Sequence, residues 1–124
     1  MTREKQIASI KLKRVYEAAS DDDGMRILVD RLWPRGLSKR RARIDQWLPD
    51  VAPSAELRRW FNHDPDKWTE FKRRYRSELR SQDEALKAIR KPASQGPVTL
   101  LFASKETRFN NAAALKEYLI RAER

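Results

Sequence analysis

The chain reads Ile27-Leu28-Val29-Asp30-Arg31-Leu32-Trp33-Pro34-Arg35-Gly36-Leu37-Ser38-Lys39 in its first third. The apolar run at the start of this segment predicts a strand that is covered on both faces, as the strands of parallel sheets are. Two charges follow at once, Pro34 and Gly36 turn the chain, and Ser38 predicts the start of a basic helix. Polar groups at the end of a buried strand lie at the rim of a sheet, where α/β folds bind ligands. The segment therefore predicts both a parallel sheet and the place of a binding site.

Strand-like segments flank this run on both sides. Residues 7–16 alternate apolar and polar side chains and end in the β-favouring pair Val15-Tyr16, which predicts a first strand. The central strand is predicted over residues 25–32, after an acidic turn at residues 21–24. Residues 98–103, Val-Thr-Leu-Leu-Phe-Ala, predict a third buried strand. Trp47-Leu48-Pro49 predicts a brief extended segment.

Helical patterns fill the intervals between these strands. Asp64-Pro65 offers an N-cap followed by proline at the first helical position, and large apolar residues then recur at helical spacing. Ser81, with Glu84 three positions on, predicts a capping box for a further helix, which should end near Arg90 before Pro92. The predicted helices span residues 38–44, 53–61, 65–79, 81–90 and 110–122.

Alternating strands and helices predict one compact α/β domain over residues 1–124, with a small, mainly parallel sheet and helices on both faces. A length of 124 residues and a hydrophobic content of 40% suffice for one core. Residues 1–6 are expected to form a flexible N-terminal tail. No run approaches the roughly 18 apolar residues that a membrane span needs, and no signal-like segment opens the chain. A cytoplasmic protein without a membrane partner is therefore expected.

The composition narrows the chemistry that the protein can perform. With no cysteine the chain has no disulfide, no thiolate zinc site and no cysteine nucleophile, and its single histidine leaves little for imidazole metal sites. The three glycines lie far apart, so the chain lacks a dinucleotide-binding loop, a P-loop and a nucleophile elbow. We therefore predict no cofactor and no metal site.

A strong positive charge points to an anionic partner. The chain carries 28 Lys and Arg residues against 18 Asp and Glu residues, a formal net charge of +10. Such a surplus attracts polyanions and phosphorylated ligands, and arginine adds bidentate geometry toward phosphate. The alternative is that the surplus only keeps a small protein soluble. Composition alone leaves both interpretations open.

The segment after the central strand is the first candidate site. In the functional interpretation, Arg31 and Arg35 hold an anion, Asp30 orients one of them, and Trp33 forms a wall or stacking surface. In the alternative, Asp30 and Arg31 form a structural ion pair and Trp33 covers the core. Asp30 is also a candidate acid or base.

Basic residues at the start of the next helix form a second candidate. Four cations lie within Lys39-Arg40-Arg41-Ala42-Arg43, where the helix dipole disfavours positive charge. An anion docked at this end would explain them, and Lys39 and Arg40 are then phosphate contacts. A solvated basic face is the other interpretation.

Two further groups complete the candidates. His63 is the natural acid or base near neutral pH, with Asp64 as its orienting carboxylate; alternatively Asp64 only caps a helix and His63 closes a loop. Ser104, at the end of the last strand, would emerge beside Arg31 if the two strands are neighbours. The remaining candidate ligand contacts are Asn110 at the start of the terminal helix, and Arg74 and Tyr75 facing a shared cleft.

Short motifs along nearly the whole chain resemble one family. They are Arg14-Val15-Tyr16, residues 29–36, Ala52-Pro53-Ser54, Glu56-Leu57-Arg58, Trp60-Phe61, His63-Asp64-Pro65, residues 71–75, residues 96–101 and Asn110-Asn111-Ala112. In this order they are similar to the YeaO-like branch of the family called domain of unknown function 488. The resemblance implies a compact α/β domain and no agreed activity, substrate or cofactor. This chain has Phe109 where the family usually has histidine, so a catalytic role of that histidine in relatives would be lost here.

Two classes of function follow from these observations. In the first, the domain binds a nucleic acid or a nucleotide-like phosphorylated ligand through its arginines, with Trp33 available to stack a base. In the second, it is a small hydrolase or transferase for a phosphorylated substrate, with His63 or Asp30 as acid or base. A protein-interaction module with an acidic partner is a third possibility. The sequence leaves open whether the protein is an enzyme, and what its oligomeric state is.

Overall fold

A parallel sheet of four strands forms the centre of the computed structural model, which describes residues 10–122. The predicted tail at residues 1–6 and the first three residues of the first predicted strand lie outside the described residues. The strands are β1 (Ile10–Arg14), β2 (Met25–Leu28), β3 (Gln46–Trp47) and β4 (Val98–Phe102). They run in the order β1-β4-β2-β3, and every pairing is parallel. The α/β fold and its parallel sheet are therefore confirmed.

Five α-helices surround the sheet in the described part of the chain. They are α2 (Lys39–Ala42), α3 (Ala55–Phe61), α4 (Trp68–Leu79), α5 (Asp83–Ala93) and α6 (Asn111–Ala122). Short 3₁₀ turns lie at Asp21–Asp23, Pro49–Val51 and Pro65–Lys67. Ser38 and Asp64, predicted at the starts of helices, each cap the turn that follows with a side-chain oxygen, and Ser54 caps α3 in the same way.

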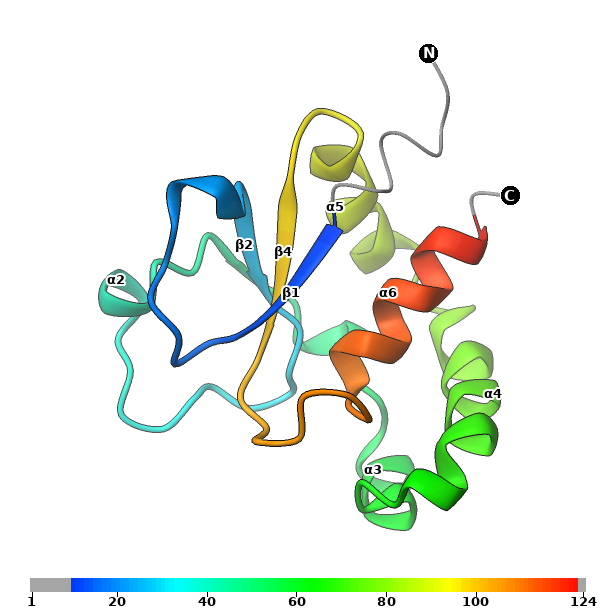
Figure 1. Cartoon of the computed structure of the whole chain (residues 1–124). Coiled ribbons are helices and arrows are strands. Elements are labelled where there is room, and N and C mark those ends of the chain that lie inside the picture. The colour runs from blue at the N-terminus through cyan, green and yellow to red at the C-terminus, as the bar shows by residue number, and fades with distance from the viewer. Residues whose placement is uncertain (1–9, 123–124) are drawn as a thin grey trace.

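The two faces of the sheet are covered unequally. Figure 1 shows α4, α5 and α6 on one side of the strands and α2 on the other. The larger core lies on the first side and includes Phe61, Phe71, Tyr75 and Leu115. The smaller core, on the second side, consists of Val15, Leu28, Ala42, Ile44 and Leu101, with Trp33 and Leu37 packed against it. Helices thus cover both faces, but one face receives only a single-turn helix and the loop before it.

That loop, residues 29–38, connects β2 to α2 and is called the rim loop below. The sequence predicts that strand β2 ends at residue 32, but in the structure it ends at Leu28. The N–H of Val29 still bonds to the carbonyl of Leu101, at 3.1 Å. The next donor on β4's side, the N–H of Ala103, bonds instead to Oδ2 of Asp30 at 2.9 Å. Because a side chain replaces the backbone acceptor there, the ladder stops and the rim loop leaves the sheet.

A buried arginine ties α2, the helix that follows the rim loop, to the sheet. The Arg26 side chain is 3% exposed and pairs with Asp23 at 2.6 Å. Its other nitrogens donate to the carbonyls of Ala42 and Arg43, at 2.8 and 3.1 Å, which are free at the C-terminus of α2. Arg26 therefore holds α2 in place through the carbonyls that the helix leaves unpaired.

The prediction of a capping box at Ser81 is wrong. The Ser81 hydroxyl donates to the carbonyl of Glu78 in the preceding helix, at 3.0 Å, and α5 begins at Asp83 without a side-chain cap. The predicted end at Arg90 is also wrong, because α5 continues through Pro92 to Ala93. Proline in the last turn removes only one intrahelical donor, and the N–H groups of Ser94 and Gly96 bond back to Arg90 and Pro92.

Candidate ligand-binding site

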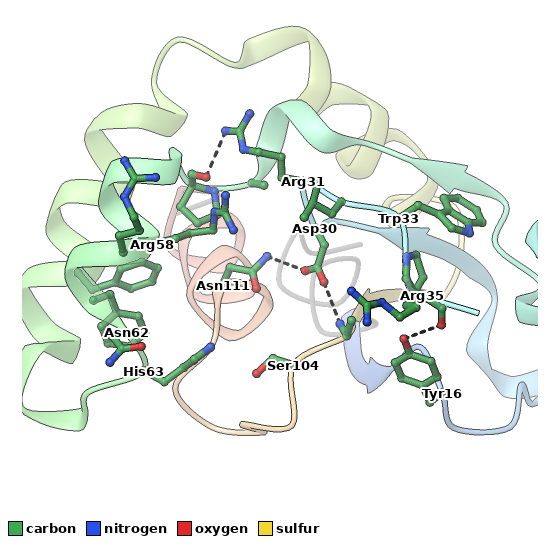
Figure 2. Close-up of a pocket in the computed structure, with 18 residues that line it drawn as sticks. Tyr16, Asp30, Arg31, Trp33, Arg35, Arg58, Asn62, His63, Ser104 and Asn111 are labelled. Atoms are coloured by element: carbon green, nitrogen blue, oxygen red, sulfur yellow. Dashed lines mark hydrogen bonds between the residues drawn. The ribbon is translucent and has the colours of Figure 1, made fainter. Parts of the chain in front are cut away.

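A cavity of about 600 Å³ lies at the carboxyl ends of β2 and β4. Its walls come from the rim loop, from α3 and the residues after it, from the end of β4 and from the first residue of α6. Figure 2 shows these segments around Asp30. Among the residues that the sequence predicts as a site, the cavity brings together Asp30, Arg31, Trp33, Arg35, His63 and Ser104.

Asp30 lines the cavity and joins three elements. Its Oδ2 accepts from the Ala103 N–H at 2.9 Å, and its Oδ1 accepts from Nδ2 of Asn111 at 3.1 Å. Burial raises the pKa of Asp30, although these two hydrogen bonds and the nearby charges of Arg58 and His63 act in the opposite direction. The carboxylate orients neither Arg31 nor Arg35, and the predicted ion pair with Arg31 is not formed within residues 10–121.

Four arginines line the cavity: Arg31 and Arg35 from the rim loop, and Arg58 and Arg59 from α3. Nη2 of Arg31 donates to the carbonyl of Pro53 at 3.2 Å. Between residues 10 and 121, none of the four forms an ion pair. Asp30 is the one carboxylate among the described residues that line the cavity. The cavity therefore carries a net positive charge that faces solvent.

Aromatic side chains form part of the rim, and their positions are fixed by hydrogen bonds. Nε1 of Trp33 donates to the carbonyl of Leu37 at 2.6 Å, and its ring meets the Trp47 ring edge-on at 5.4 Å. The Tyr16 hydroxyl donates to the carbonyl of Arg35 at 3.1 Å. Trp33 is half-buried and lines the cavity while it also packs on the smaller core. Both interpretations of Trp33, as a wall and as a core cover, describe part of its role.

His63 enters the cavity from the turn that follows α3. Asn62 and His63 have positive φ values of 46° and 54°, a conformation that side chains seldom adopt. Nδ1 of His63 lies 3.0 Å from the carbonyl of Phe109. Since a carbonyl only accepts, Nδ1 carries a proton in this contact. Asp64 does not orient this ring, because its carboxylate caps the next turn through the N–H of Asp66.

Several predicted ligand contacts lie outside the cavity. Tyr75 is buried, and its hydroxyl donates to the carbonyl of Val51. Arg74 lies over the Trp60 ring at 4.1 Å and pairs with Glu70 at 2.8 Å. Lys39 and Arg40 do not line the cavity.

Asn110 also has a different role from the predicted one. It is buried, its Oδ1 accepts from the Ala113 N–H at 2.9 Å, and its Nδ2 donates to the carbonyl of Glu106 at 2.8 Å. It therefore caps α6, and the next residue, Asn111, reaches the cavity instead. Sequence reasoning misses Tyr16, Arg58, Arg59, Asn62 and Asn111 as cavity residues. For Arg58 and Arg59 a signal exists in the sequence, because they lie as a pair on a helix whose Leu57 and Phe61 face inward.

The described part of the chain contains neither a candidate metal site nor a helix that could cross a membrane. Residues 10–121 contain no group of three or more His, Cys, Asp or Glu side chains that could hold a metal ion. Among the described helices, none combines the length and the apolar character that crossing a bilayer requires.

The fold and the cavity define a small parallel α/β domain with an arginine-lined hollow at its strand ends. The chain belongs to the domain of unknown function 488 family: residues 9–124 match the family model described as "Inactive DUF488-N3 subclade". It is 42% identical over 110 residues to the uncharacterized protein Rv3073c of Mycobacterium tuberculosis, which covers 89% of this chain and 92% of that protein. It is 40% identical over 111 residues to the uncharacterized protein YeaO of Escherichia coli, covering 90% and 96%. No solved structure matches the chain. The resemblance to the YeaO-like branch is thus confirmed.

Proposed function

We propose that the cavity binds a phosphorylated, nucleotide-like ligand, either free or as a unit of a nucleic acid. The observation that supports this function is the set of four arginines around one cavity, unpaired within residues 10–121 and accompanied by one carboxylate. On α4, Arg73 and Arg74 are neutralised by Glu70 at 2.6 and 2.8 Å, while other exposed arginines without an ion pair between residues 10 and 121, such as Arg80, do not line the cavity. Unneutralised guanidinium groups around a hollow suit a phosphate, which each of them can bind in a bidentate manner.

The size and the walls of the cavity suit a nucleotide. Its volume of about 600 Å³ lies within the range of roughly 300 to 1,000 Å³ that is usual for small-molecule sites. Trp33 and Tyr16 supply aromatic surfaces at the rim, and Tyr16 is 45% exposed. Base stacking on exposed aromatic rings beside a basic groove is a common mode of nucleotide binding.

Titration with nucleotides tests this proposal. The probes are adenosine 5′-monophosphate, adenosine triphosphate and a single-stranded oligonucleotide. Their binding is measured by calorimetry at about 50 mM salt, where phosphate contacts are strong. We expect Arg31→Ala combined with Arg35→Ala to weaken binding by at least about tenfold, the effect of one lost charged hydrogen bond or more. The control is Arg73→Ala combined with Arg80→Ala, which removes the same charge from exposed positions outside the cavity.

The outcomes of this titration separate the alternatives. Absence of binding to every probe, or an equal loss in the control, contradicts the proposal. Binding of the oligonucleotide but not of the mononucleotides identifies the ligand as a strand. If no nucleotide binds but an acidic protein titrated in the same way does, the third possibility, an interaction module, is supported.

Catalysis on the bound ligand is the second candidate function. It is favoured by Asp30, a carboxyl whose pKa is raised by burial, and by His63, whose Nε2 forms no hydrogen bond within residues 10–121, in the same cavity. The family's description as inactive and Phe109 in place of the usual histidine argue for binding alone. A panel of phosphoesters incubated with the native chain and with His63→Ala decides the point. Turnover that depends on His63 would make the protein an enzyme.

A further inference from the structure

Two partly buried side chains, Asp30 and Asn111, line the cavity side by side and are called its floor below. Each oxygen of the Asp30 carboxylate accepts one hydrogen bond from an N–H group of the protein, which is the arrangement of an ionised carboxylate. A carboxylate accepts about four hydrogen bonds in all, so each oxygen has capacity for another. Asp30 therefore presents two neighbouring acceptors to a ligand.

Asn111 adds a third acceptor next to Oδ1 of Asp30. Its Nδ2 donates to the carbonyl of Val29 at 3.2 Å and to Oδ1 of Asp30 at 3.1 Å. Because both neighbours only accept, the amide nitrogen faces them, and both of its protons are used. Within residues 10–121 no donor bonds to the amide oxygen of Asn111, and this oxygen is not among the buried atoms that lack a partner. The two side chains of the floor thus offer acceptors, and no donor, to a ligand.

The walls of the cavity are apolar and its mouth is basic. Pro53, Phe61 and Phe71 are buried and line the cavity, whereas Arg35 and Arg58 line it from exposed positions. In Figure 2, Arg58 and Arg35 lie on opposite sides of Asp30, and Asn111 lies next to the carboxylate. A complementary ligand has flat apolar faces, donates several hydrogen bonds from one edge and carries an anionic group at its other end.

Among nucleotides, those of guanine have this arrangement. The N1–H and the 2-amino group of guanine are neighbouring donors on the edge of the base that lies away from the sugar and the phosphate, and their spacing matches the two oxygens of a carboxylate. Adenine and cytosine instead place a ring nitrogen that only accepts beside their amino group, and uracil has one N–H between two carbonyls. An acceptor of the base that faces a carboxylate is repelled. A ribose also donates hydrogen bonds, but it has no flat apolar faces for the walls.

We infer that Asp30 and Asn111 bind the N1–H and the 2-amino group of a guanine base, so that the site selects guanine nucleotides. The N1–H donates to Oδ2 of Asp30, one amino proton donates to Oδ1, and the other donates to the amide oxygen of Asn111. The phosphate of the same nucleotide then lies at the mouth, among the exposed arginines. This inference rests on the proposed function and names its ligand class.

The sharpest test changes one donor of the base and leaves the protein native. Guanosine, inosine and adenosine 5′-monophosphates are titrated into the full chain by calorimetry at neutral pH and about 50 mM salt. Inosine monophosphate lacks only the 2-amino group, whereas adenosine monophosphate presents an acceptor at N1. We expect inosine monophosphate to bind about tenfold more weakly than guanosine monophosphate, and adenosine monophosphate to bind at least as weakly as that, because each leaves acceptors of the floor unpaired.

A second set of probes tests the same base within a strand. It consists of single-stranded DNA hexamers of thymidine in which one position carries guanine, hypoxanthine or adenine. The same order of affinities is expected if the site takes its nucleotide from a strand. A preference for guanine in the hexamers alone identifies the ligand as a unit of a strand, and a preference in the mononucleotides alone identifies it as a free nucleotide.

A protein variant assigns the preference to Asp30. In Asp30→Asn an amide presents one acceptor and one donor, so the ratio of guanine to hypoxanthine affinities should fall to about one or below. Asp66→Asn, which changes an exposed carboxylate outside the cavity, is the matched control and should keep the ratio of the native chain. If Asp30→Asn does not fold, the comparison of ligands on the native chain decides the inference.

The outcomes separate this inference from the proposed function. A preference for guanine in either set of probes, lost in Asp30→Asn, supports the inference. If guanine is not preferred in any set of probes that binds, the inference is overturned and the proposed function stands. A folded Asp30→Asn variant that keeps the ratio of the native chain overturns the inference as well. Failure of every mononucleotide and every hexamer to bind overturns both proposals.

Discussion

Arg26 holds the region around the cavity together from inside the sheet. Its guanidinium bonds to the carbonyls of Ala42 and Arg43 and to the carboxylate of Asp23, and it has almost no exposed surface. The Asp23 carboxylate is shared with Lys13, at 3.1 Å. Because a buried cation without its partner is very costly, this pair matters more than any surface ion pair of the molecule.

Replacement of Asp23 by Asn should lower the free energy of unfolding by about 3 kcal/mol or more, because Arg26 loses its charged partner. Chemical denaturation at neutral pH measures this loss. Glu84→Gln, which removes an exposed carboxylate beside Lys87, is the control and should leave stability unchanged. A loss of equal size in both variants would contradict the role of the buried pair.

The stability that Asp23→Asn loses should depend on pH. Burial alone would raise the pKa of Asp23, but hydrogen bonds from Ser20, Lys13 and Arg26 outweigh it and lower the pKa from 3.8 to about 2. The ionised carboxylate therefore stabilises the fold fully above the unfolded-state pKa, and this contribution is lost as the pH falls from 3.8 toward about 2. The difference in stability between the native chain and Asp23→Asn should shrink over that interval. A constant difference would show that Asp23 does not act through its charge.

Residue types alone identify the cavity residues of the rim loop but not their partners. Asp30, Arg31 and Arg35 follow an apolar strand, and this local signal places them correctly at the rim. Asn111 is brought to Asp30 across 81 positions of the chain, and no pattern near either residue indicates the contact. The choice between Asn110 and Asn111 depends on which of the two caps α6, and one residue of shift exchanges their roles.

Helix α3 carries half of the cavity's arginines, and its start is fixed by Ser54. The Ser54 hydroxyl accepts from the N–H of Leu57 at 3.1 Å and donates to Oε2 of Glu78 at 2.6 Å. The Ser54 N–H donates to the other oxygen of Glu78, at 2.8 Å. One side chain on α4 therefore determines where α3 begins and how Arg58 faces the cavity.

Replacement of Ser54 by Ala should cost about 1 to 2 kcal/mol of stability, since it removes an N-cap and leaves Glu78 with one fewer donor. Ser38→Ala is the matched control, because Ser38 caps the four-residue helix α2 at an exposed position through a single bond, to the N–H of Arg41. We expect a smaller loss there. Urea denaturation of both variants checks this, and a larger loss in Ser38→Ala would contradict the importance of the Glu78 contact.

Helices begin at the residue that the sequence predicts where the capping side chain is free to bond to the helix. They begin elsewhere where that side chain bonds to another part of the fold. The helix starts at Ser38 and Asp64 are predicted correctly from the sequence, and both residues act as caps. Ser81 fails as a cap because its hydroxyl is used by the end of α4, and the sequence offers no sign of that preference. Strand β2 is shorter than its apolar run for a similar reason, since Asp30 takes over the donor that would extend the ladder.

Across the whole molecule, the +10 charge should make nucleotide binding strongly dependent on salt. For a single-stranded oligonucleotide, the logarithm of the affinity falls with the logarithm of the salt concentration, with a slope of about 0.7 per phosphate contact. Arg35→Ala should reduce this slope by about that amount, whereas Arg73→Ala, whose guanidinium already pairs with Glu70, should not change it. Affinities measured over a series of salt concentrations test the prediction. Equal slopes in all three proteins would mean that the cavity does not contact the phosphates.

Composition and periodicity predict the fold of the whole molecule well, because one apolar strand between helical segments allows few arrangements. Composition and periodicity do not predict that the two faces of the sheet are covered unequally. This unequal covering depends on the single turn of α2 and on Arg26, which lies in the middle of a strand and gives no sign in the sequence that it reaches Ala42.

The separate core of five residues beneath the rim loop has a consequence for how such proteins diverge. Trp33 and Leu37 of the rim loop pack on this smaller core, on the side of the sheet away from the four longer helices, so exchanges in that part of the loop leave the packing of those helices untouched. Descendants of one ancestor can therefore acquire new ligand preferences by altering a few rim side chains, while the supporting architecture drifts at its own pace.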